Sequence, residues 1–150
     1  MMKYLFIATA MIAFLACKKE ARVSFEESLK GNWKQTAYDT TAFNYSITNV
    51  TFECNEFMLE TRFQTDSLNL QDSCSEYTWT DKIIGSYFVK TNEIFVQGYY
   101  VDEQGENKLT GCHGVGYFEH TFIGKIFKDR LVLSSEEYNY PLTLKNKIDC

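Results

Sequence analysis

Apolar and polar residues alternate between positions 45 and 64, and this pattern constrains the fold more than any other feature of the chain. In residues 45–54, Val50 and Phe52 fall on one face and Thr51 and Glu53 on the other. A turn at Asn55 follows. The next segment has one face made of Phe57, Leu59, Thr61 and Phe63 and an opposite face made of Met58, Glu60, Arg62 and Gln64. Alternation with period two is typical of a half-buried strand, so the sequence predicts a β-hairpin here.

The remaining chain is also rich in Tyr, Phe, Thr and Val and holds one proline, Pro141, which favours strands throughout. Further strands are predicted at residues 32–40, 83–90, 93–101, 117–127, 130–138 and 140–147, with a short additional strand at 75–80. Residues 65–74 and 102–116 are predicted to be loops. We expect one helical turn at 25–30, with Ser24 as N-cap, Glu27 completing a capping box and Gly31 ending the turn.

Eight antiparallel strands joined by short turns predict an all-β fold, a single up-and-down barrel with at most this one N-terminal helical turn. Closure of the barrel removes exposed strand edges that promote aggregation. A membrane-spanning barrel is disfavoured, because its outward faces need an apolar band. Here the predicted outward residues include charged side chains, namely Glu53, Glu60, Arg62 and Lys90.

The N-terminus predicts export. Lys3 precedes an apolar run from Tyr4 to Ala16, which is too short to span a bilayer but has the length of a signal peptide. Ala16 before Cys17 resembles a bacterial lipobox, which implies a signal peptide over 1–16, lipidation of Cys17, a tether over 17–24 and a domain over 25–150. Lys18 after the cysteine favours a lipid anchor in the outer membrane of the cell envelope. The alternative is an ordinary signal peptide followed by an unmodified cysteine.

Four further cysteines, an even number, fit an oxidising compartment and predict two disulfides. These are Cys54, Cys74, Cys112 and Cys150. We favour Cys54–Cys74 with Cys112–Cys150, which close segments of comparable size, over Cys54–Cys112 with Cys74–Cys150. Free buried thiols are the remaining alternative.

Several classes of function are disfavoured by the residues. The net charge of −5 and the scattered cations argue against nucleic-acid binding. The two histidines, His113 and His120, match no zinc spacing, and no nucleophile with a base stands out. The sequence therefore predicts a protein that is not an enzyme and that has no catalytic residues, metal site or cofactor.

The segment Leu29-x-Gly31-x-Trp33, after a short helical turn, resembles the start of lipocalin-like (calycin) barrels and of small bacterial lipoproteins with that fold. The resemblance implies that Gly31 opens the first strand and that Trp33 plugs the closed end of the barrel. In that superfamily an arginine late in the chain stacks on the tryptophan, and Arg130 is the only late arginine here.

Three functions remain open for a monomeric, lipid-anchored barrel with twelve Phe, ten Tyr and two Trp. One is binding of a small apolar or amphipathic ligand in the barrel mouth, in a cavity of about 300 Å³ or more. Its predicted ligand-binding residues are Phe57, Phe63, Tyr87 and Tyr99. The alternative is a filled barrel that contacts envelope proteins or polysaccharide through an outer aromatic patch, with Tyr77, Trp79 and Tyr100 as candidates. A weaker third reading is an inhibitor of a secreted enzyme that presents the 102–116 loop.

Overall fold

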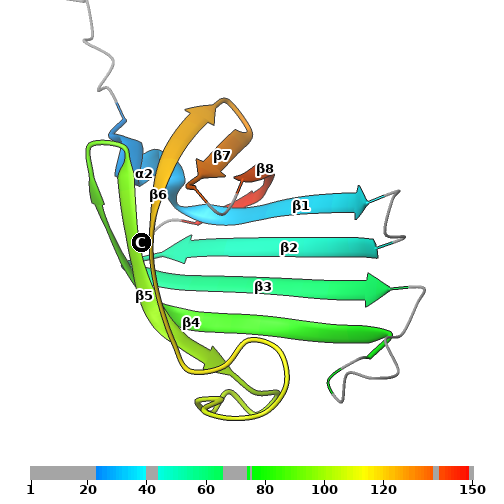
Figure 1. The fold of residues 1–150 in the computed structure, drawn as a ribbon. Helices are drawn as coiled ribbons and strands as arrows, with labels where there is room; N and C mark the ends of the chain where they lie inside the picture. Colours follow the sequence, from blue (N-terminus) through cyan, green and yellow to red (C-terminus); the bar gives the residue numbers. More distant parts are fainter. Residues whose placement is uncertain (1–22, 40–43, 66–73, 75, 137–138, 149–150) are drawn as a thin grey trace, which may run out of the picture.

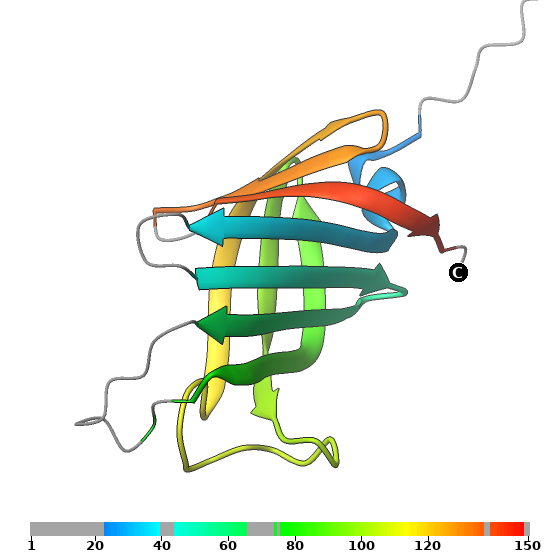
Figure 2. The same ribbon diagram turned by 90° about the vertical axis from the view of Figure 1, so that its right-hand side faces the viewer.

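The computed structural model describes residues 23–39, 44–65, 74, 76–136 and 139–148 and places one short helix before eight strands. The elements are α2 (Phe25–Leu29), β1 (Gly31–Asp39), β2 (Asn44–Glu53), β3 (Glu56–Thr65), β4 (Thr78–Lys90), β5 (Glu93–Val101), β6 (Tyr117–Phe127), β7 (Arg130–Ser134) and β8 (Asn139–Lys147). Each strand is antiparallel to the next and β8 pairs with β1, so the sheet is a closed up-and-down barrel in chain order (Figures 1 and 2). The predicted fold class is confirmed.

The two ends of the barrel differ. Helix α2 lies at the end where β1 begins, and the 102–116 segment lies at the opposite end (Figures 1 and 2). We call these the helix end and the loop end. Among the described residues, no helix is long and apolar enough to cross a membrane.

The short helix forms as its capping residues predict. The Ser24 side chain accepts a hydrogen bond from Glu27 N at 3.1 Å, which satisfies one backbone donor of the first turn. The Glu27 carboxylate accepts a hydrogen bond from Lys30 Nζ at 2.9 Å. The helix ends at Leu29, and Gly31 is already the first residue of β1.

The helix end is closed by a dense apolar core. Phe25 packs so tightly against Gly124 that a Cβ atom there would lie 2.5 Å from the Phe25 ring. Trp33 is 1% exposed, and its indole N–H donates to the Leu29 carbonyl at 2.8 Å. Arg130 is exposed at the start of β7. The polar contact of Trp33 is with the Leu29 carbonyl of α2.

Two predicted strand boundaries are wrong. The short strand at 75–80 and the strand at 83–90 form one strand, β4, which continues through Asp81 and Lys82. The strand predicted at 130–138 ends at Ser134. The predicted hairpin at 45–64 is confirmed, with Phe52 paired to Phe57 across its turn.

The interior of β1–β4 is organised in rows, because register brings one inward residue from each strand side by side. From the helix end, the four rows are Gly31–Phe52–Phe57–Gly85, Trp33–Val50–Leu59–Ile83, Gln35–Thr48–Thr61–Asp81 and Ala37–Ser46–Phe63–Trp79. Successive rows are two residues apart, or about 7 Å along the strands. The interior therefore changes from apolar to polar towards the loop end, and aromatic rings follow in the last row.

Candidate functional site

A polar row crosses the barrel interior and consists of Gln35, Thr48, Thr61 and Asp81. Thr48 and Thr61 are 3% and 6% exposed, and their hydroxyl oxygens lie 3.2 Å apart. Gln35 Oε1 is buried without a hydrogen-bond partner among the described residues. Buried polar atoms cost free energy unless they are paired, so a row of four is unusual for an interior that serves packing alone.

A cavity of about 130 Å³ lies beside this row. Its lining residues come from β3, β4, β5 and β6 and are Leu59, Thr61, Phe63, Asp81, Ile83, Tyr100 and Phe118. We call this space the inner cavity. It is smaller than the cavity of about 300 Å³ expected for a ligand-binding barrel, so the ligand it suits is small.

Three stacked rings stand at the loop end next to the inner cavity. The His113 ring lies 4.6 Å from Trp79 at an interplanar angle of 8°, and Trp79 lies 4.8 Å from Phe63 at 15°. His113 belongs to the 102–116 segment and has a left-handed backbone with φ of 63°. A non-glycine residue in this conformation is held by its surroundings, here by the stack and by the loop.

The 102–116 segment is a hydrogen-bonded loop. Asp102 Oδ1 accepts bonds from the backbone N–H groups of Gln104 and Glu106 at 3.0 and 2.9 Å, which form a tight turn. Gly114 N donates to Asp81 Oδ1 at 3.0 Å. A Cβ at Gly114 would lie 2.0 Å from the Tyr100 ring, so the loop backbone rests directly on a residue of the inner cavity.

A disulfide fastens this loop, and it differs from both predicted pairings. Cys74 and Cys112 are joined, with Cα atoms 5.2 Å apart. Both predictions are wrong because each paired Cys74 with a different residue. The register explains the difference: Lys82 pairs with Val101, so the residues before β4 lie beside those after β5. Cys54 is also disulfide-bonded, and Cys150 lies outside the described residues, as does the predicted lipidation site Cys17.

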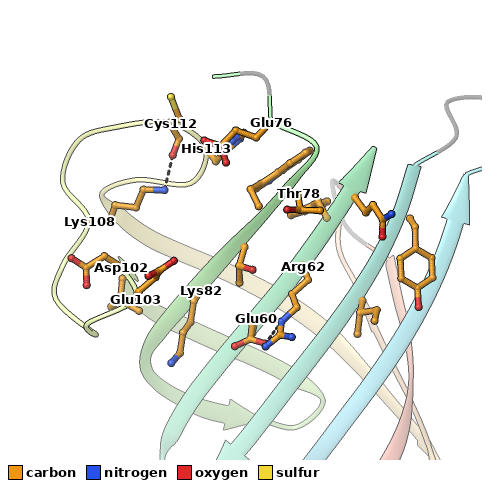
Figure 3. Close-up of a pocket in the computed structure, with 17 residues that line it drawn as sticks. Glu60, Arg62, Glu76, Thr78, Lys82, Asp102, Glu103, Lys108, Cys112 and His113 are labelled. Atoms are coloured by element: carbon orange, nitrogen blue, oxygen red, sulfur yellow. Dashed lines mark hydrogen bonds and ion pairs between the residues drawn. The ribbon is translucent and has the colours of Figure 1, made fainter. Parts of the chain in front are cut away.

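A second space of about 1010 Å³ lies outside the barrel, between the outer faces of β2–β4 and the 102–116 loop (Figure 3). Its charges are mixed. Three cationic side chains line it together with four anionic ones, namely Arg62, Lys82 and Lys108 with Glu60, Glu76, Asp102 and Glu103. Arg62 Nε pairs with Glu60 Oε1 at 3.2 Å, and Lys108 Nζ donates to the Cys112 carbonyl at 2.5 Å. This outer groove therefore favours neither anions nor cations.

The four predicted ligand-binding residues do not line one cavity. Phe57 and Tyr87 lie in the core at the helix end, packed on Phe52 at ring distances of 5.5 and 5.0 Å. Tyr99 is 40% exposed on the outer face of β5, so its predicted place in the barrel interior is wrong. Phe63 alone of the four lines the inner cavity, and it also borders the outer groove.

The aromatic residues proposed for the outer surface are also distributed differently. Tyr77 is 59% exposed, as expected. Trp79 belongs to the ring stack and Tyr100 lines the inner cavity, so neither forms an outer patch.

Three side chains at the helix end have shifted pKa values. Burial, followed by the negative charge of Glu26, raises the pKa of Tyr87 above its ordinary value of 10.0. The hydrogen bond from Lys30 to Glu27 lowers the pKa of the Glu27 carboxyl and raises the pKa of the Lys30 amine. These groups are remote from the inner cavity.

Metal-binding geometry is lacking in the described part of the chain, where no three His, Cys, Asp or Glu side chains gather. Cys112 is oxidised, so it supplies no thiolate next to His113. His120 lies on β6 with its ring 4.6 Å from Phe122.

Sequence reasoning missed Asp81 and Gln35. Asp81 falls in the gap between the strands predicted at 75–80 and 83–90, so no inward position is predicted for it. The signal that would have found it is the alternation Trp79, Asp81, Ile83, which continues the inward face of β4 through the charged residue.

No protein-family model, curated protein or solved structure matches this chain. The fold and the site define its class instead: a closed, eight-stranded up-and-down β-barrel, packed at the helix end and partly polar inside at the loop end.

Proposed function

We propose that this protein is a lipid-anchored protein of the bacterial cell envelope whose lipocalin-like barrel binds a small amphipathic ligand at the loop end. The anchor is Cys17, exposed by removal of the signal peptide 1–16. The resemblance to lipocalin-like barrels rests on Gly31 and Trp33, and the position of Trp33 in the core at the helix end supports it.

The observation that carries the ligand-binding proposal is the polar row Gln35–Thr48–Thr61–Asp81 beside the inner cavity. A barrel filled for stability alone gains nothing from four polar inward positions in one row, because burying them costs free energy that apolar side chains avoid. Next to aromatic walls, the row gives an environment with polar and apolar sides, which suits an amphipathic ligand.

Native mass spectrometry tests this proposal. The Cys17→Ser protein, expressed in its own host, is expected in the soluble envelope fraction, whereas the wild-type protein stays with the membranes. The soluble protein is expected to carry a non-covalent adduct that is lost on denaturation. An apo mass with a folded barrel would contradict ligand binding.

A matched pair of variants locates the adduct. Ile83 is 2% exposed and lines the inner cavity, and its neighbour Ile84 is 42% exposed on the outer face. Ile83→Phe fills the cavity and is expected to abolish the adduct, while Ile84→Phe retains it. Circular dichroism confirms that both variants are folded. An adduct that persists equally in both would exclude the inner cavity as its site.

The alternative function, an interaction module that contacts envelope proteins or polysaccharide, is favoured by a different observation. Two separate aromatic pairs lie on the outer face of β4–β6. Phe88 stacks on Phe95 with ring centroids 4.5 Å apart, and Tyr99 contacts Tyr117 at 5.2 Å. Phe88, Tyr99 and Tyr117 are 61%, 40% and 51% exposed. An apo mass in the experiment above would favour this alternative.

A further inference from the structure

The inner cavity has an unusual charge: its described lining residues include one carboxylate and no cation. Asp81 is the sole charged residue among the described residues that line it. Two ion pairs occur among the described residues, Glu27–Lys30 and Glu60–Arg62, and neither includes Asp81. A charge that is partly buried without a counter-charge is costly, so the cavity is electrostatically complementary to a cation.

The neighbouring cations do not supply that charge. Lys82 follows Asp81 in β4, so its side chain points to the outer face of the strand and lines the outer groove. Lys108 Nζ is bonded to the Cys112 carbonyl. The Gly114 N–H is a neutral donor, and it engages one oxygen of the carboxylate, Oδ1.

The walls favour a cation as well. Phe63, Tyr100 and Phe118 line the cavity, and Tyr100 and Phe118 meet edge to face at 6.1 Å. The face of an aromatic ring carries partial negative charge and attracts ammonium groups, most strongly where water is excluded. An anion would meet the Asp81 carboxylate with no cation beside it among the described lining residues, so the cavity disfavours anions.

Size limits the ligand further. A cavity of about 150 Å³ with apolar walls holds benzene, which has six non-hydrogen atoms. The inner cavity, of about 130 Å³, is similar in size. The Thr61 hydroxyl, paired with Thr48, offers an oxygen that can accept a hydrogen bond from the ligand.

We propose that the inner cavity binds a small organic amine in its protonated form, with the ammonium group paired to the Asp81 carboxylate and the hydrocarbon part against Phe63, Tyr100 and Phe118. This inference rests on the proposed function and names the class of its ligand. The 102–116 loop takes part in the site, because Gly114 holds the same carboxylate.

Two probes of equal size and shape test the charge requirement. Cyclopentylamine carries an ammonium group, and cyclopentanol replaces it with a hydroxyl. NMR titration of the lipid-free Cys17→Ser protein is expected to give at least about 10-fold tighter binding of the amine, the ratio that a charge-assisted contact provides. The Gly114 amide resonance is expected to shift with the amine, because its N–H donates to Asp81.

Asp81→Asn removes the charge and keeps an oxygen that accepts the Gly114 hydrogen bond. This variant is expected to bind both probes equally. The control Glu119→Gln changes the net charge by the same amount on the outer face of β6 and is expected to keep the preference for the amine. Equal binding of the probes to the Cys17→Ser protein, no binding of either probe, or a preserved preference in Asp81→Asn would overturn the inference.

The outcome is separable from that of the proposed function. If the native adduct is present but proves to be a neutral or anionic molecule, the barrel binds a ligand and the amine assignment fails. If no native adduct is found and cyclopentylamine does not bind, both proposals fail.

Discussion

The burial of a single residue, Tyr87, makes the stability of the folded protein depend on pH. Its side chain is 4% exposed and meets Phe52 edge to face at 5.0 Å and 76°. Burial disfavours the phenolate, so the pKa of Tyr87 in the folded protein lies above that in the unfolded chain. The unfolded chain therefore loses this proton first as the pH rises. The stabilisation that the raised pKa of Tyr87 gives the folded protein is fully present below about pH 10. It is lost as the pH rises through the pKa of Tyr87 in the folded protein.

Tyr87→Phe removes this titration and isolates its effect. Other tyrosines titrate in both proteins, so the quantity to compare is the difference in free energy of unfolding between wild type and variant. We expect this difference to be constant up to about pH 10 and then to shift in favour of the variant at higher pH. Urea unfolding at about pH 8 and about pH 11 measures it. A difference that is the same at both values would contradict a raised pKa.

Trp33 and Asp81 show how far single residues were predictable. The resemblance to lipocalin-like barrels places Trp33 at the closed end, and in the structure Trp33 is buried at the helix end. Asp81 faces inward on the adjacent row of the barrel, yet local sequence assigns a charged residue to the surface. Its partner is Gly114, 33 residues later, and no local pattern reveals such a contact.

At the level of elements, strands β4 and β5 approach closely where two glycines pair. Gly85 lies opposite Gly98, and a Cβ at Gly85 would come 1.9 Å from the Gln97 carbonyl oxygen. The obstructing atoms belong to the backbone, so the two strands must separate to admit a side chain. Glycine at this pair therefore lets the barrel wall close at β4–β5.

Gly85→Ala is expected to lower the free energy of unfolding by about 3 kcal/mol, because overpacking against backbone displaces both strands. Urea unfolding monitored by circular dichroism measures the loss. The neighbouring variant Ser86→Ala, on the exposed face, is the control and is expected to change stability by less than about 1 kcal/mol. Equal stability of the two variants would show that the strands tolerate a methyl group here.

The elements themselves were largely predictable from alternation, and their limits were not. The β2–β3 hairpin follows directly from its two-residue pattern, and the structure confirms it, with Phe52 opposite Phe57. Two strands are predicted where the structure has the single strand β4. Asp81 and Lys82 pair with Thr61 and Glu60 of β3, and Lys82 also pairs with Val101 of β5, which holds the segment extended. Hydrogen bonding between strands thus overrides local propensity.

At the level of the whole molecule, the two ends of the barrel are stabilised in different ways. The helix end is closed by buried apolar side chains such as Leu29, Trp33 and Phe52. The loop end depends on the ring stack, the Gly114–Asp81 hydrogen bond and the Cys74–Cys112 disulfide. The crosslink restricts the unfolded chain between residues 74 and 112, whereas in the folded protein it acts on the loop that it holds.

Replacing both cysteines of this disulfide by serine separates the two effects. The crosslink joins residues 38 positions apart, so its loss is expected to cost about 4 kcal/mol of unfolding free energy. Backbone amides of the 102–116 loop are expected to exchange faster with deuterium even where the barrel remains folded. For the amides of β2 and β3, the free energy of opening is expected to stay equal to that of global unfolding. Exchange that accelerates equally in loop and strands would mean that the disulfide stabilises the fold as a whole and does not hold the loop over the inner cavity.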